Sequence, residues 1–376
     1  MDAARSERYR TLYGEIGHTP LYEIRYISIP NGNRIFAKEE YQNPTGSHYD
    51  RVFLRLFEGL EEEGLITTGD ELVETTSGNA GASFAWLCSI LGYKGTVLIP
   101  EDMPVTRIAQ IRSFGVNVHF TPARQYVSGV IEGLRGFLRL QAEKGRRIYC
   151  LNHAESRHSV DGMRSCGYEI LEQLREHGAG QPDFFIAALG GGISASAICD
   201  VLDEQSPSTK TIGFEPFEAP ENYIRRYPGR FESTYGMAPA LGPHELLGIG
   251  RWGDTSYTFP HIETLLPRLS EIMLITQDRW MAADRDLRVV EAKFVGHTSA
   301  AALSAALDLC RTIHDTTVVI IFYDPSWKYL GTAGDWRAAT NGKATSISSA
   351  AHRPAARGRH SVHNRPGGRR YEWLQP

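Results

Sequence analysis

The chain lacks any apolar run close to the ~20 residues that a membrane-spanning helix needs. Its first eight residues lack the apolar core of a signal peptide, and a formal net charge of −4 provides no general attraction to nucleic acid. These absences predict a cytoplasmic protein without a membrane or nucleic-acid partner. An apolar fraction of 41% and a charged fraction of 22% also exclude a disordered, collagen-like or coiled-coil chain.

Cysteine is scarce, and its five positions are scattered, odd in number and mostly set in apolar runs. This pattern fits neither a disulfide framework nor a zinc site, so we expect reduced, buried thiols and no metal centre. His153 and His158 lie only five residues apart, and we interpret them as polar loop residues rather than metal ligands. The cysteines are Cys88, Cys150, Cys166, Cys199 and Cys310.

Short β-branched or aromatic runs alternate with amphipathic windows along most of the chain. This alternation predicts βαβ units and an α/β fold, and the almost wholly apolar strands indicate parallel sheets covered on both faces. The expected strands are 34–38, 95–100, 116–120, 183–187, 209–213 and 317–322. The expected helices are 48–64, 80–92, 104–114, 125–143, 162–177, 193–205, 277–291 and 299–313.

Two segments depart from this alternation. Segment 217–265 is rich in proline, glycine and aromatic residues without a clear period, which predicts a long loop region over a site or interface. Its apolar content also favours a homodimer. Segment 336–376 carries eight lysines or arginines and few aliphatic residues, which predicts a disordered basic tail, with contact to phosphate or a partner as the alternative.

A turn of small polar residues, 74–81, is expected between a strand that ends near Val73 and a helix from about Ala80. Such a turn can bring several N–H donors to the start of a helix, where an anion such as a carboxylate binds. The alternative is an ordinary turn in which Ser77 or Asn79 only caps the helix.

Three consecutive glycines, Gly190, Gly191 and Gly192, follow the strand 183–187 and open the helix that begins near Ile193. Without side chains, an oxygen-rich ligand can approach the backbone, and the helix N-terminus favours negative charge. The pattern is neither GxGxxG nor GxxxxGKS/T, so it does not by itself indicate a nucleotide, and a plain tight turn is the alternative. Both turns are expected at carboxyl ends of parallel strands, where ligands of α/β proteins usually bind.

Segment 43–51, Asn-Pro-Thr-Gly-Ser-His-Tyr-Asp-Arg, resembles the Asn-Pro-Thr-Gly-Ser-x-Lys-Asp-Arg segment of the fold-type II pyridoxal-phosphate enzymes. Cysteine synthase and the catalytic core of cystathionine β-synthase are the most similar groups. Six further segments match in the same order, so the resemblance covers about residues 10–332. They are 16–21, 76–81, 100–103, 190–192, 213–216 and 295–300.

The resemblance implies two α/β domains, each a three-layer unit around a parallel sheet, with the ligand cleft between them. We expect a large domain of residues 1–40 plus 155–335 and a small mobile domain of residues 41–154. Because the family usually dimerises, the resemblance also implies a homodimer, and it implies a small amino-acid substrate.

The resemblance also implies roles for the two turns. Thr76, Ser77 and Asn79 match the loop that grips the substrate α-carboxylate, and Asn79 matches the asparagine that bonds the cofactor's 3′-oxygen. The glycines 190–192 match the phosphate-binding turn. Two hydroxyl donors of the family are missing there, so backbone N–H groups and Ser194 would hold the phosphate.

Two positions depart from the family pattern. Tyr49 stands where the family has its Schiff-base lysine, and a phenol cannot form the covalent bond to the cofactor aldehyde. Pro325 stands where a serine often bonds the pyridine nitrogen, and Ser326 is shifted by one residue. The resemblance therefore implies that pyridoxal phosphate, where it binds, is held non-covalently.

No other residue is an obvious substitute for the missing lysine. Lys38 matches an additional lysine of the family, and Lys293 and Lys328 lie on segments that do not normally face the aldehyde. His48 and Tyr49 could form a proton-transfer pair, or they could simply fill the vacated site.

Three functions are compatible with these residues. The first is a cysteine synthase-like enzyme that performs β-elimination or β-replacement on an amino acid with atypical use of pyridoxal phosphate. The second is a non-catalytic binding or regulatory relative. The third is an enzyme that has abandoned the cofactor and reuses the cleft.

Overall fold

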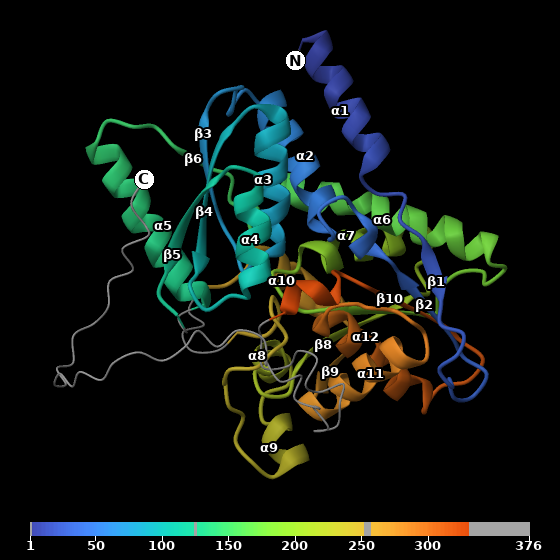
Figure 1. The fold of residues 1–376 in the computed structure, drawn as a ribbon. Coiled ribbons are helices and arrows are strands. Elements are labelled where there is room, and N and C mark those ends of the chain that lie inside the picture. The colour runs from blue at the N-terminus through green and yellow to red at the C-terminus, as the bar shows by residue number, and fades with distance from the viewer. Residues whose placement is uncertain (1, 124–125, 252–256, 331–376) are drawn as a thin grey trace, which may run out of the picture.

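The computed structural model describes residues 2–123, 126–251 and 257–330, which form two sheets flanked by helices (Figure 1). Neighbouring strands are parallel in both sheets, except for one antiparallel pair at the edge of the larger sheet. The α/β fold with parallel sheets that the sequence predicts is therefore confirmed. The edge pair was not foreseen, because its first strand has only three residues.

The large sheet has six strands, in the spatial order β1 (Leu21–Glu23), β2 (Arg34–Lys38), β10 (Thr317–Ile321), β7 (Phe184–Ala188), β8 (Lys210–Pro216) and β9 (Glu271–Ile275). All five residues of the central strand β10 are buried, which explains its uninterrupted apolar sequence. The small sheet has four strands, in the order β5 (Asn117–Thr121), β4 (Lys94–Pro100), β3 (Glu71–Thr75) and β6 (Tyr149–Cys150).

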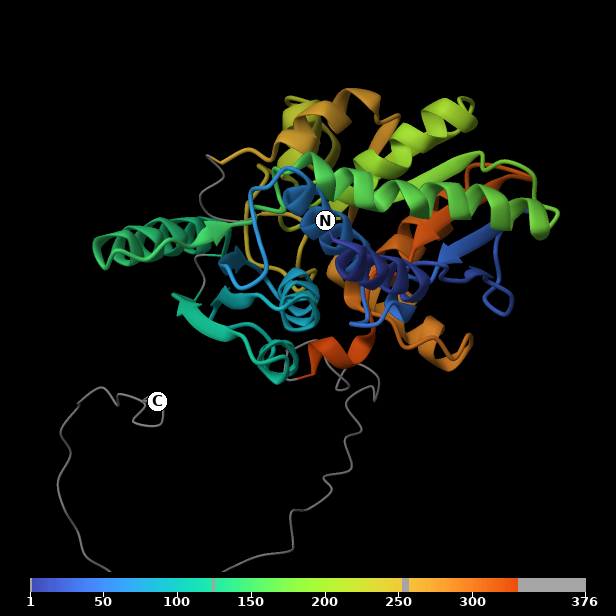
Figure 2. The same cartoon turned by 90° about the horizontal axis from the view of Figure 1, so that it is seen from above.

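Helices cover both faces of each sheet. Over the small sheet, α5 (Tyr126–Glu143) lies on the face opposite α3 (Asn79–Leu91) and α4 (Val105–Ser113) (Figure 1). The large sheet lies between two helix pairs (Figure 2). These pairs are α6 (Arg157–Glu176) with α7 (Ile193–Gln205), and α11 (Gln277–Val289) with α12 (His297–Cys310). The small-sheet strands all fall within residues 41–154, while the mobility of that domain stays a prediction.

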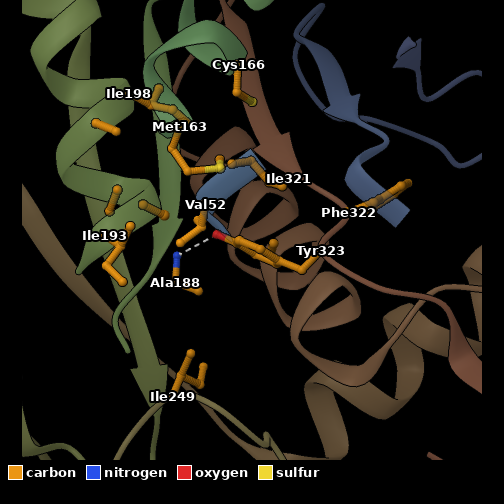
Figure 3. Close-up of a cluster of buried hydrophobic side chains, with 14 of the residues drawn as sticks. Val52, Met163, Cys166, Ala188, Ile193, Ile198, Ile249, Ile321, Phe322 and Tyr323 are labelled. Carbon is orange, nitrogen blue, oxygen red and sulfur yellow. Dashed lines mark hydrogen bonds between the residues drawn. The ribbon is translucent and has the colours of Figure 1, made fainter. Parts of the chain in front are cut away.

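Helix α2 (Tyr49–Glu62) joins the two halves of the molecule through a buried cluster (Figure 3). Val52 of α2 belongs to this cluster together with Met163 of α6 and Ile321 of β10. Tyr323, directly after β10, accepts a hydrogen bond on its hydroxyl from the Ala188 backbone N–H at 3.1 Å. Burial of an aliphatic side chain such as Val52 or Ile321 stabilises the fold by about 1.5–3 kcal/mol. The start of α2 is therefore held firmly in position.

Two predictions from the sequence need correction. Segment 217–265 is not simply a long loop, because it contains three short helices, each of six residues and therefore too short to show a period. His158 is not a loop residue, because α6 already begins at Arg157 and buries this side chain against Glu63. The short helices are α8 (Glu221–Arg226), α9 (Arg230–Tyr235) and α10 (Pro260–Leu265).

The remaining elements lie at the margins of the two sheets. Helix α1 (Ala3–Glu15) was not expected, since only Tyr9 and Leu12 of its residues are buried. Three single 3₁₀ turns are η1 (Glu40–Gln42), η2 (Leu266–Arg268) and η3 (Ser326–Tyr329).

Some sequence predictions concern features outside these elements. All five cysteines are free, and four of them are buried. Among the described residues, no helix is long and apolar enough to cross a membrane, and no group of three or more acidic, histidine or cysteine side chains is placed to hold a metal. The predicted tail 336–376 lies outside the described residues.

Candidate functional site

A cavity of about 350 Å³ lies where the carboxyl ends of β3, β7 and β10 meet, with walls from both sheets. This is the edge at which ligands of parallel α/β sheets usually bind. The cavity brings together every site residue expected from the sequence except Ser326. These residues are His48, Tyr49, Thr76, Ser77, Asn79, Gly190, Gly191, Gly192 and Ser194.

The glycine turn after β7 has no room for side chains. A Cβ atom on Gly190 would lie 2.3 Å from the Gly248 carbonyl oxygen, and one on Gly192, whose φ is +89°, would lie 2.8 Å from the Ile262 backbone nitrogen. Helix α7 starts directly after the turn, and the N–H groups of its first turn have no intrahelical partners. Backbone donors, the positive helix end and Ser194 therefore border one end of the cavity, as an anion such as phosphate requires.

The turn after β3 is shaped by its own threonine. Thr76 Oγ1 accepts hydrogen bonds from the backbone N–H groups of Gly78 at 2.8 Å and Gly81 at 2.9 Å, and Gly78 has a φ of +143° that only glycine adopts easily. The alternative that Ser77 or Asn79 caps the helix is wrong, because Gly78 is the N-cap of α3 and the side chain that binds a first-turn N–H is that of Thr76. Ser77 and Asn79 face the cavity instead.

A buried polar network surrounds Asn79. Its Nδ2 donates to Asp324 Oδ2 at 2.7 Å, and its Oδ1 accepts from Lys328 Nζ at 3.0 Å. Arg107 lies 3.2 Å from the same Asp324 oxygen, and the Tyr329 hydroxyl donates to Asp324 Oδ1 at 3.1 Å. Buried charges persist in proteins when they are paired and hydrogen-bonded, so this network fixes the amide of Asn79. Burial lowers the pKa of Lys328 to about 8.

Arg107 connects the small-sheet side of the cavity with the large-sheet side. Besides pairing with Asp324, it donates to the Ser77 carbonyl at 3.0 Å and to the Lys328 carbonyl at 3.2 Å. The sequence argument missed both charged residues as site members. Asp324 lies three residues after the end of β10, so the rule that ligands bind at carboxyl strand ends could have identified it. Arg107 lies inside α4 and gave no such signal.

His48 and Tyr49 lie at the start of α2, and both line the cavity. The centroids of their rings are 4.4 Å apart. The His48 ring also contacts Tyr323, at 5.2 Å, and the Tyr49 ring contacts His153, at 5.5 Å. Burial lowers the pKa of His48 to about 4, so its imidazole is neutral near pH 7. His153 also lines the cavity, with its backbone N–H 3.1 Å from Glu74 Oε2, and its place just after β6 is the signal that the sequence argument overlooked.

Several residues from the sequence argument, Ser326, Lys38, Lys293 and Lys328 among them, do not line the cavity. Ser326 begins η3, and the residue of that segment which lines the cavity is Asp324. The one-residue shift caused by Pro325 therefore removes the serine from the wall. Lys38 and Lys293 each pair with a glutamate at 2.6 Å and contact no residue of the cavity wall through those pairs.

The residues present fit pyridoxal phosphate at the phosphate end. The glycines at positions 190 and 192 let the turn lie directly against the backbone of Gly248 and Ile262, with which a Cβ would collide. Two polar atoms of wall residues, Thr298 Oγ1 and His48 Nδ1, are buried without a hydrogen-bond partner. Because buried polar atoms are nearly always hydrogen-bonded, these two atoms indicate that a ligand with polar groups completes the site.

Comparison with known proteins agrees with this geometry. A family model described as pyridoxal-phosphate dependent enzyme matches residues 12–324. The chain is 29% identical to a cysteine synthase of Staphylococcus aureus over 318 residues, which cover 84% of this chain and 94% of that protein. It is 27% identical to cysteine synthase B of Escherichia coli over 322 residues, which cover 86% of this chain and 95% of that protein.

Solved structures show the same similarity. The fold matches a hydrogen sulfide-producing enzyme from Fusobacterium nucleatum with a TM-score of 0.71 and 28% identity, covering 85% of this chain and 97% of that one. It matches an O-acetylserine dependent cystathionine β-synthase from Helicobacter pylori with a TM-score of 0.72 and 26% identity, again covering 85% and 97%. The chain therefore belongs to the family of pyridoxal-phosphate dependent enzymes, and its fold is that of the cysteine synthase-like members.

Proposed function

We propose that the protein performs β-elimination or β-replacement on a small amino acid, with pyridoxal phosphate held in the cavity and no covalent bond to residue 49. The observation that carries this proposal is the phenol of Tyr49 at the cavity wall, on the segment that resembles the lysine-bearing segment of the family. The glycine turn and the Thr76–Asn79 loop support it, because they supply donors for a phosphate and for a carboxylate.

In this proposal each wall segment has one task. The glycine turn and the first turn of α7 bind the phosphate, while Ser77 and the loop around it bind the substrate carboxylate. Pyridoxal phosphate, when bound, supplies an electron sink for the substrate Cα. His48, neutral near pH 7, and Tyr49 hold or move the Cα proton, a role that the family gives to its lysine.

One observation favours a second candidate, a non-catalytic relative or an enzyme that works without the cofactor. Both polar atoms of the Asn79 amide are already engaged, with Asp324 and with Lys328. The second hydrogen of Nδ2 is the one donor of this amide that a cofactor oxygen can use without displacing Asp324. An amide that is already bonded within the protein is also what a chain that never binds the cofactor would have.

The test starts with the purified protein incubated with pyridoxal phosphate and then desalted. We expect retained cofactor, measured by absorbance after denaturation, and a change in the absorbance spectrum when O-acetylserine and sulfide are added. Ser326→Ala is the matched control, because Ser326 does not line the cavity, and it should behave like the parent. Retention without a spectral change would support the non-catalytic relative, and no retention would contradict the proposal.

The homodimer and the cytoplasmic location expected from the sequence remain proposals. Light scattering at micromolar concentration measures the first directly, and a monomer there would contradict it.

A further inference from the structure

The amine of Lys328 lies beside the segment that carries Tyr49. Lys328 is fully buried in η3, and its Nζ contacts Asn79 Oδ1 at 3.0 Å. A Cβ on Gly46 would lie 3.3 Å from Lys328 Cε, so the lysine side chain packs against the backbone three residues before Tyr49. The chain thus places a primary amine next to segment 43–51 although position 49 itself has none.

The other described lysines are placed differently. Lys38 and Lys293 are bound to glutamates, Lys210 lies over the ring of Phe184, and Lys94 and Lys144 are exposed. Among the described residues, Lys328 is the one lysine whose amine is hydrogen-bonded to a cavity-lining side chain. Its position in the fold, rather than its position in the sequence, therefore makes it a candidate nucleophile.

The surroundings of Lys328 suit an amine that must react. Arg107 binds the Lys328 carbonyl at 3.2 Å and holds η3 against α4. Asp324 and Asp50 favour the protonated amine, whereas Arg107 and burial favour the neutral one. Burial is the largest effect and brings the pKa to about 8, so a usable fraction of the amine is neutral and nucleophilic at neutral pH.

We propose that Lys328 supplies the amine that binds the aldehyde of pyridoxal phosphate covalently in this chain. In this step the neutral Nζ adds to the aldehyde carbon, a C=N double bond replaces the C=O double bond, and the aldehyde oxygen leaves as water with the two protons that the amine carried. No oxidant or reductant is required. The inference rests on the proposed function, since it presupposes that the cofactor enters the cavity.

The same step resolves the engagement of Asn79. Lys328 is not itself part of the cavity wall, and its amine lies one hydrogen bond behind Asn79. When Nζ leaves Asn79 Oδ1 for the aldehyde, this oxygen becomes free to accept a hydrogen bond from another donor. The second hydrogen of Nδ2 is available for a cofactor oxygen before and after that step.

The experiment is reduction with borohydride after loading with pyridoxal phosphate, followed by peptide mapping by mass spectrometry. We expect the pyridoxyl group on the peptide that contains Lys328 and none on the peptide 43–51. Lys38, Lys210 and Lys293 are internal controls for non-specific labelling in the same map. A label on one of these lysines, or no label while cofactor is retained, overturns the inference and leaves the proposed function standing. Loss of cofactor on desalting overturns both.

Two variants sharpen the result. Lys328→Met should abolish the label while Lys293→Met keeps it. Tyr49→Lys should add a label on peptide 43–51. That label would show that an amine at position 49 also reaches the aldehyde of the bound cofactor. If Lys328→Met does not fold, the map of the parent protein still decides, because it needs no substitution.

Discussion

The two ends of the cavity differ in the groups that line them, which are backbone groups at one end and side chains at the other. The glycine turn binds through backbone N–H groups and the start of α7, so it needs only the right backbone path and small residues. The opposite region depends on individual side chains, namely Tyr49, Asn79 and their partners. A backbone site tolerates the loss of neighbouring hydroxyls, whereas one substitution in a side-chain site changes the chemistry. With the proposed tyrosine in place of the family's lysine, this difference would explain how the chain keeps the frame of its family without the family's reactive group.

The largest expected effect comes from the side-chain end. Tyr49→Phe should lower turnover by roughly 10²–10⁴, the range typical for loss of a general acid or base. The measurement is exchange of the substrate Cα proton for deuterium, followed by NMR. Tyr41→Phe is the control, because the Tyr41 hydroxyl bonds Glu39 and does not line the cavity. An unchanged exchange rate in Tyr49→Phe would mean that the phenol only fills space and that His48 or water carries the proton.

At the backbone end, cofactor binding should depend on the volume of the side chain introduced rather than on its chemical groups. Gly190→Ala should weaken retention of pyridoxal phosphate on the order of 100-fold, the effect of losing one or two hydrogen bonds to a charged group. The reason is that its Cβ would lie 2.3 Å from a backbone oxygen, so the turn must move. Gly14→Ala in α1 is the control, since Gly14 does not line the cavity and its Cβ would meet no atom within 4 Å. Equal affinities for the two variants, measured by equilibrium dialysis, would refute the backbone account.

A smaller effect is expected where a side chain supports a backbone turn. Thr76→Val leaves the N–H groups of Gly78 and Gly81 without their acceptor and should destabilise the fold by about 1–3 kcal/mol. Thr76→Ser keeps the hydroxyl and should cost much less. Urea unfolding followed by circular dichroism measures both, and a loss of equal size in the serine variant would argue that the methyl group, not the hydroxyl, holds the loop.

The smallest effect concerns pH. Because the pKa of Lys328 is lowered to about 8 in the folded protein, the unfolded chain binds more protons between about pH 8 and its ordinary pKa of 10.5. The free energy of unfolding should therefore rise with pH across this window, by at most about 1.4 kcal/mol per pH unit from this group. Lys328→Met should lack that contribution in urea unfolding at pH 8, 9 and 10. Parallel curves for parent and variant would show that the amine is not desolvated.

The sequence predicted the backbone end of the site far better than the side-chain end. Glycine runs and alternating strands and helices are local patterns, so the turn at 190–192 and most large elements were located within a few residues. The contact of Asn79 with Asp324 and Lys328 joins residues about 250 positions apart, and no local pattern reports such a pair. Lys328 was set aside because its segment was judged by the family pattern, not by its packing.

The smaller errors have similar causes. The helices within 217–265 have six residues each, less than two turns, so their burial leaves no period to detect. Ser326 was counted as a site residue by nearness in sequence, but the extended backbone at Pro325 separates it from Asp324, and only the aspartate lines the cavity. Which residue of a short loop faces a cavity is decided by backbone direction, which composition does not reveal.

Arg107 bears on how fast a ligand can enter and leave. Two of its contacts, to Asp324 and to the Lys328 carbonyl, cross from the small-sheet side to the large-sheet side, and Asn79 adds two more. If the small domain moves as predicted, widening the gap between the sheets has to break these four contacts, so we expect them to raise the barrier to opening. The time that a ligand stays in the cavity would then depend on these contacts as well as on the phosphate end. Because Arg107 and Asp324 are only 2% and 1% exposed, added salt should change the rate of opening little.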